Sequence, residues 1–119
     1  MVLADDLPEY RSWLRSLVES SPEFQVIGEA NNGWEAVKLV QMLSPDLLIC
    51  DVEMPELDGL DVARQVRDNC PEVRVILISS HRERVHVRLA NAEGALGFIS
   101  KNDLSLESLT RALREVAPP

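Results

Sequence analysis

The sequence predicts an α/β fold in which a parallel sheet of five strands is covered by helices on both faces. Three prolines, Pro22, Pro45 and Pro71, each end an amphipathic segment and precede an apolar run. Proline cannot continue a helix and restricts the residue before it, so each proline separates a helix from a strand. The continuous apolar run 47–50 indicates a strand buried on both faces, as in a parallel sheet.

The first half of the chain alternates strands with helices. Strands are expected at 2–4, 24–29 and 47–50, where apolar runs stand between turn residues. Pro8 opens the first helix, since proline is tolerated at the first helical position. Asn32 begins the second helix, whose apolar residues recur at helical spacing. Asp51 then lies where the third strand ends.

The second half continues the same alternation. Strands are expected at 73–78 and 95–100, and the first of these is the most apolar and β-branched run of the chain. Asp58 and Ser105 are suited to cap the third and fifth helices. The fourth helix is expected at 82–93, where the apolar stripe is thin, so it should be the least firmly packed element.

Five strands that alternate with five helices predict a doubly wound (βα)5 sheet. Right-handed crossovers leave few topologies for such a sheet. The flavodoxin-like strand order 2-1-3-4-5 is favoured over a Rossmann order, because the chain has no room for a sixth strand. With 119 residues, the chain is expected to form a single domain, 1–119.

Composition excludes several classes of function. The net charge is −8, and residues 1–60 alone carry 3 basic against 12 acidic residues, which argues against nucleic-acid binding by this domain. The sequence has no apolar run long enough to cross a bilayer and no signal peptide, so a cytoplasmic protein without membrane contact is expected. Two cysteines without a CxxC motif predict neither a disulfide framework nor a zinc site. Cys50 should be a small buried apolar residue, and Trp13 and Trp34 should serve packing.

Polar residues follow four of the predicted strands. Asp5 and Asp6 follow the first, Asp51 the third, Ser79 the fourth and Lys101 the fifth. Ligands of open α/β sheets bind outside the carboxyl ends of the strands, so these groups should share one edge. Crowded carboxylates favour a cation such as Mg²⁺, and an aspartate beside it can serve as a nucleophile that forms an acyl phosphate.

Each of these groups also has a simpler interpretation. Taken alone, Asp5 and Asp6 are typical of a solvated turn, Lys101 of an exposed surface and Ser79 of a loop hydroxyl. Only their combination favours a site. The glycines form neither a GxGxxG nor a GK[ST] motif, so nucleotide binding is disfavoured.

The combined pattern resembles the receiver domain of bacterial two-component response regulators. The matching pieces are Asp5-Asp6, Asp51 with Pro55 and Asp58-Gly59 behind it, Ser79, and the segment 94–101 that ends in Lys101. The segments 3–8 and 26–30 are similar to the NarL/FixJ (LuxR-type) subfamily. The resemblance covers essentially the whole chain.

This resemblance implies a magnesium-dependent phosphorylation of Asp51 by a sensor histidine kinase. The implied magnesium ligands are Asp51 and Asp6 directly, Asp5 mostly through water, and Glu53 through its backbone carbonyl. Lys101 would pair with the phosphoryl oxygens. Ser79 and Phe98 would move together as the switch, which couples the site to the fourth helix, the fifth strand and the fifth helix; Phe98 is equally well explained as a core residue.

The resemblance also implies partners. Phosphorylation is expected to drive formation of a homodimer, and DNA would be bound only through an output domain that is absent from this chain. The chain would then be either a stand-alone receiver or part of a longer protein. Two other functions remain open, a pseudo-receiver that never takes phosphate and, with less support, an aspartate-nucleophile phosphatase. The latter class requires a DxD motif, and Glu53 occupies its second position.

Overall fold

A computed structural model describes residues 1–80 and 94–114, which form a parallel five-stranded sheet in the order β2-β1-β3-β4-β5. The strands are β1 (Val2–Ala4), β2 (Gly28–Ala30), β3 (Leu47–Asp51), β4 (Arg74–Ser79) and β5 (Gly97–Ser100). The helices are α1 (Pro8–Glu19), α2 (Gly33–Leu43), α3 (Gly59–Asn69), the 3₁₀ turn η1 (Lys101–Asp103) and α5 (Leu106–Arg114). The predicted fold class and strand order are confirmed.

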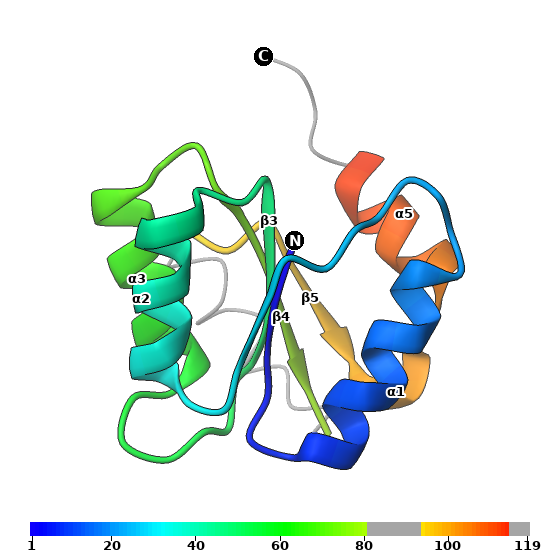
Figure 1. Ribbon diagram of the computed structural model, residues 1–119, viewed down its shortest axis with the longest axis horizontal. Helices are drawn as coiled ribbons and strands as arrows, with labels where there is room; N and C mark the ends of the chain where they lie inside the picture. The colour runs from blue at the N-terminus through cyan, green and yellow to red at the C-terminus, as the bar shows by residue number, and fades with distance from the viewer. Residues whose placement is uncertain (81–93, 115–119) are drawn as a thin grey trace.

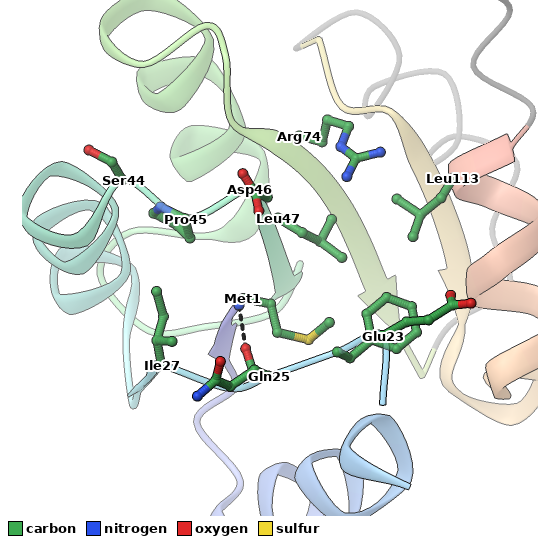
Figure 2. Close-up of a pocket in the computed structure, with 11 residues that line it drawn as sticks. Met1, Glu23, Gln25, Ile27, Ser44, Pro45, Asp46, Leu47, Arg74 and Leu113 are labelled. Carbon is green, nitrogen blue, oxygen red and sulfur yellow. Dashed lines mark hydrogen bonds between the residues drawn. The ribbon is translucent and has the colours of Figure 1, made fainter. Parts of the chain in front are cut away.

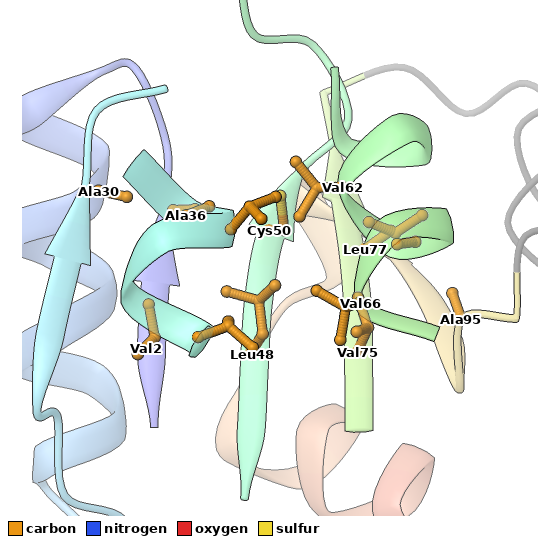
Figure 3. Packing of buried hydrophobic residues seen from close by; sticks show 14 of the residues in the cluster. Val2, Ala30, Ala36, Leu48, Cys50, Val62, Val66, Val75, Leu77 and Ala95 are labelled. Carbon is orange, nitrogen blue, oxygen red and sulfur yellow. The ribbon is translucent and has the colours of Figure 1, made fainter. Parts of the chain in front are cut away.

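The sheet separates two layers of helices (Figure 1). Helices α2 and α3 cover one face, and α1 and α5 cover the other. Side chains of β3 alternate between the two cores: Leu48 and Cys50 pack toward α2 and α3, whereas Leu47 and Ile49 pack toward α1 and α5. Figure 3 shows the first of these cores, where Leu48 and Cys50 lie on the face of the sheet that α2 and α3 cover. This two-sided burial is the reason that 47–50 is apolar without interruption.

Helix starts agree with the predicted caps. Asn32 accepts a hydrogen bond from the backbone N–H of Glu35 at 2.9 Å, and Asp58 accepts one from Asp61 at the same distance. Ser105 accepts from the backbone N–H of Ser108 at 3.0 Å. Each cap satisfies a backbone donor that the first helical turn leaves unpaired.

The predicted boundaries of β2 are wrong. The strand spans Gly28–Ala30 and not 24–29. Phe24 and Val26 are apolar because they pack into the core beside α1 and α5, before the chain pairs with β1. A hydrogen bond of 2.8 Å from the Ile27 N–H to the Met1 carbonyl aligns the chain for the ladder that follows.

The other strands differ less. Strand β4 begins one residue later than predicted, because Val73 closes a turn onto the Cys70 carbonyl at 3.0 Å. Strand β5 begins at Gly97 and not at Ala95. The predicted helix at 82–93 lies outside the described residues.

Two predictions about single residues have opposite outcomes. Cys50 is fully buried, as expected for a small apolar side chain. Trp13 and Trp34 are about half exposed, so each can contribute only part of its surface to packing, and their predicted role stays a prediction. Among the described residues, no helix combines the length and the apolar character needed to cross a membrane.

Candidate functional site

Three carboxylates meet at the carboxyl edge of the sheet. Asp5 and Asp6 follow β1, and Asp51 is the last residue of β3, the strand that pairs directly with β1. One carboxylate oxygen from each residue lies within 4.8 Å of the others. Asp5 and Asp51 are buried, whereas Asp6 is the most accessible of the three. Hard oxygen donors at this spacing are the donor set that Mg²⁺ prefers.

The polar atoms of Asp5 make three hydrogen bonds and one ion pair. Its backbone N–H donates to the Ala30 carbonyl at 3.1 Å, and its Oδ1 accepts the Leu7 N–H at 2.8 Å. The second carboxylate oxygen forms an ion pair with Lys101. Its carbonyl accepts a hydrogen bond of 2.7 Å from the Arg11 guanidinium. The residue therefore has one defined position at the end of β1.

Lys101, in the turn after β5, is the cation of the site, and 9% of its side chain is exposed. Its Nζ lies 2.8 Å from Asp5 Oδ2 and 3.4 Å from Asp51 Oδ2. The ring of Tyr10 covers it, with 4.2 Å between Nζ and the ring centroid. An ammonium against an aromatic face gains a cation–π interaction, which is stronger where water is excluded.

Asp51 lies in an environment that disfavours its charge. Burial raises the pKa of this carboxyl to about 6, and the neighbouring Asp5 adds to the effect. The Lys101 ammonium and the hydrogen bond from the Glu53 N–H to Asp51 Oδ1, at 3.3 Å, act in the opposite direction. A carboxylate that lacks full compensation is ready to accept a further cation.

Ser79 ends β4 beside Glu53. The Ser79 hydroxyl donates to Glu53 Oε1 at 2.9 Å, although Ser79 itself is fully buried. Phe98, on β5, is partly buried and packs against the core on the α2 and α3 side. The polar residues predicted from the strand ends thus lie at one edge, and Glu53 and Phe98 flank them.

Close backbone packing sets the position of Asp51. Gly59, at the start of α3, donates its N–H to the Val52 carbonyl at 2.8 Å. A Cβ on Gly59 would lie 2.4 Å from the carbonyl oxygen of Asp51. Only glycine lets the first turn of α3 approach the end of β3 this closely.

Sequence reasoning missed two residues of the site, Tyr10 and Arg11. Tyr10 lies at an apolar position of the first helix in the sequence, which gives it no role in the site, yet its ring covers Lys101. Burial and the nearby carboxylates raise the pKa of Tyr10. The sequence does contain a signal for both residues. Because the helix begins at Pro8, Tyr10 and Arg11 lie in its first turn, close to the acidic pair Asp5 and Asp6.

A hollow of about 360 Å³ lies at the opposite, amino edge of the sheet (Figure 2). Its walls come from Met1, from the segments that lead into β2 and β3, from the start of β4 and from α5, and Asp46 and Arg74 contribute charges to it. None of the three clustered aspartates lines this hollow. The chemistry of the strand ends therefore identifies the acidic edge as the candidate site.

Comparison with known proteins identifies the family of the chain. The family model of the response regulator receiver domain matches residues 1–114. The chain belongs to this family. The nitrate/nitrite response regulator NarL of Escherichia coli strain K12 is 32% identical to this receiver domain over 117 residues, which cover 98% of the receiver domain and 54% of NarL. The receiver domain thus spans about half the length of that relative.

Solved structures give the same result for the receiver domain. The signal receiver domain of a NarL response regulator from Mycobacterium tuberculosis has a TM-score of 0.85 and 34% identity, with 94% of each chain covered. CheY in the CheX–CheY–BeF3–Mg²⁺ complex from Borrelia burgdorferi has a TM-score of 0.84 and 26% identity, with 97% of this chain and 86% of that chain covered. The predicted resemblance to receiver domains of the NarL type is confirmed.

Proposed function

We propose that this receiver domain is a phosphorylation-dependent switch that accepts a phosphoryl group on Asp51 from a sensor histidine kinase. The observation that carries the proposal is the convergence of Asp5, Asp6 and Asp51 with the Lys101 ammonium at one edge of the sheet. The domain takes part only in its own phosphorylation and dephosphorylation and turns over no metabolite. We propose a cytoplasmic location for the domain, where it would meet the kinase.

Asp51 and Lys101 have different roles in the proposed transfer. A carboxylate oxygen of Asp51 attacks phosphorus, an O–P bond forms, and the N–P bond of the donor imidazole breaks. Lys101, which lies 3.4 Å from Asp51 Oδ2, pairs with the phosphoryl oxygens. Positioning and charge neutralisation are the main contributions of a protein to such a transfer.

The carboxylates of Asp5, Asp6 and Asp51 fit a magnesium site. Their oxygens lie within 4.8 Å of one another, and the raised pKa of Asp51 reflects negative charge that is not fully compensated. When bound, Mg²⁺ offsets the charge on the phosphoryl oxygens. Glu53 is proposed to add its backbone carbonyl to this set.

Ser79 and Phe98 are the proposed switch. In the unphosphorylated domain the Ser79 hydroxyl donates to Glu53, so it must exchange this partner to reach a phosphoryl oxygen. The movement opens space next to β5 into which the partly buried Phe98 ring turns. Phosphorylation then favours a homodimer, and DNA is bound through an output domain in the remainder of a longer protein, as the length of NarL suggests.

Intact-mass measurement tests the acceptor. The protein is incubated with Mg²⁺ and either acetyl phosphate or phosphoramidate, whose N–P bond mimics the histidine donor. We expect a gain of one phosphoryl group that requires Mg²⁺, is absent in Asp51→Asn and persists in the control Asp46→Asn. No gain with either donor would indicate a pseudo-receiver, and continuous release of phosphate from phosphate esters would indicate a phosphatase.

Sedimentation velocity tests the proposed dimer. The same phosphorylated sample should sediment faster than the unphosphorylated one, and Asp51→Asn should not respond. Equal sedimentation of wild-type protein before and after phosphorylation would overturn the dimer while leaving the phosphoacceptor intact.

A further inference from the structure

Arg11 connects the acidic turn after β1 to β2 and to the residue that follows it. Its Nη1 donates to the Asp5 carbonyl at 2.7 Å and to Asn31 Oδ1 at 2.7 Å, and its Nε donates to Glu29 Oε1 at 3.0 Å. Only 15% of the side chain is exposed. The planar guanidinium reaches the three acceptors from two nitrogens in a fixed geometry, whereas an ammonium would have to reach them all from one nitrogen.

The Asp5 carbonyl that Arg11 holds belongs to the peptide bond joining the two clustered acids, Asp5 and Asp6. Within the described part of the chain, the Asp6 carboxylate makes no hydrogen bond or ion pair, unlike Asp5. Its location is therefore set by the backbone that carries it. A fixed carbonyl on the Asp5 side limits rotation of that peptide, so the contact with Arg11 controls where the Asp6 carboxylate lies.

We propose that Arg11 is a positioning residue that holds the Asp5–Asp6 turn in the geometry required for binding a divalent cation. This inference rests on the proposed magnesium site. Groups that hydrogen-bond to the carriers of metal ligands commonly control affinity by about 10- to 100-fold. Arg11 touches none of the clustered carboxylate oxygens and acts only through the main chain and through Glu29 and Asn31.

The sign of the effect separates positioning from simple electrostatics. Arg11 is a cation near a cation site, so removal of its charge by itself would strengthen Mg²⁺ binding. Loss of positioning weakens it. Arg15 provides the matched control, because it also pairs with Glu29, at 2.6 Å to Oε2, but makes no contact with the Asp5 carbonyl.

The experiment measures Mg²⁺ affinity by calorimetry in wild type, Arg11→Ala, Arg11→Lys and Arg15→Ala, with thermal unfolding recorded for each. We expect the dissociation constant to rise about tenfold in Arg11→Ala, to rise also in Arg11→Lys, and to stay unchanged in Arg15→Ala. Amide NMR signals of residues 5–7 should shift in metal-free Arg11→Ala and not in Arg15→Ala. If Arg11→Ala does not fold, Arg11→Lys carries the same comparison.

Two results would overturn the inference in different ways. Wild-type affinity in both Arg11 variants, or tighter binding in Arg11→Ala, would show that the turn needs no such support. An equal loss in Arg15→Ala would assign the effect to Glu29 and not to the Asp5 carbonyl. Absence of Mg²⁺ binding by the wild type would instead overturn the proposed function itself.

Discussion

Lys101 lies 2.8 Å from Asp5, although their strands, β5 and β1, are separated in the sheet by β3 and β4. The long lysine side chain crosses the ends of both intervening strands to reach the acidic cluster. Its Nζ is the cation that compensates two buried carboxylates, on Asp5 and Asp51, before any metal binds. Stability of the domain and the proposed phosphorylation of Asp51 should therefore depend on the same ion pair.

Loss of the Lys101 ammonium should destabilise the metal-free domain. Lys101→Met keeps most of the volume but leaves two buried carboxylates without their cation, which costs about 3 kcal/mol of unfolding free energy. Urea unfolding at pH 7 in EDTA measures the loss. The control is Lys38→Met on the exposed face of α2, which should be nearly neutral. Equal stabilities of the two variants would refute the structural importance of the ion pair.

Asp51→Asn should stabilise the metal-free domain at neutral pH. The folded pKa of about 6 lies above the ordinary 3.8, so the folded protein binds this proton more tightly than the unfolded chain. Stability of the wild type then falls as pH rises from about 4 through about 6, and the loss is complete above that window. We expect Asp51→Asn to raise the free energy of unfolding by about 1–2 kcal/mol at pH 7 and to leave it unchanged at pH 4. The gain at pH 7 is this modest because water near the site screens the charge.

Urea unfolding of both proteins across this pH range, in EDTA, is the measurement. The exposed Asp68→Asn serves as the control and should show no such difference between pH 4 and pH 7. A constant difference in stability between wild type and Asp51→Asn at all pH values would contradict the raised pKa.

Gly59→Ala should damage the site through the backbone. The added Cβ would approach the Asp51 carbonyl to 2.4 Å, so either β3 or α3 has to shift. We expect a loss of about 2–3 kcal/mol together with weaker phosphorylation of Asp51. Gly97→Ala is the matched control, because its Cβ would meet only the Ala112 methyl at 3.6 Å. The measurements are thermal unfolding and the extent of phosphorylation by intact mass for both variants. Equal melting temperatures and equal phosphorylation of Gly59→Ala and Gly97→Ala would argue against the close approach of α3 to β3.

Tyr10→Phe should not destabilise the domain. The Tyr10 hydroxyl is buried and finds no hydrogen-bond partner among the residues that the structure describes, whereas its ring contacts Lys101 and Trp13. Removing an unsatisfied buried hydroxyl recovers about 1 kcal/mol, and the ring that covers Lys101 is retained. Thermal unfolding should show an equal or higher melting temperature for Tyr10→Phe and a lower one for Tyr10→Leu. A clear loss in Tyr10→Phe would reveal a partner for the hydroxyl.

Local signals predicted most of the fold. Proline stops, caps at Asn32, Asp58 and Ser105, and apolar runs each act within a few residues, so their effects are visible in the sequence. The boundary of β2 failed because Phe24 and Val26 are apolar for contact with the α1 and α5 face and not for strand pairing. Packing between distant segments leaves no local mark that separates these two causes.

The sequence by itself determined the chemical groups of the site, since each follows a predicted strand and parallel strands end at a common edge. The tertiary structure alone decided their pairing. Lys101 lies nearer to Asp5 than to Asp51. The Ser79 hydroxyl donates a hydrogen bond to Glu53, and Arg11 donates one to the Asp5 carbonyl. These relationships depend on the reach and direction of side chains over several strands, which burial and competing charges select only after the chain has folded.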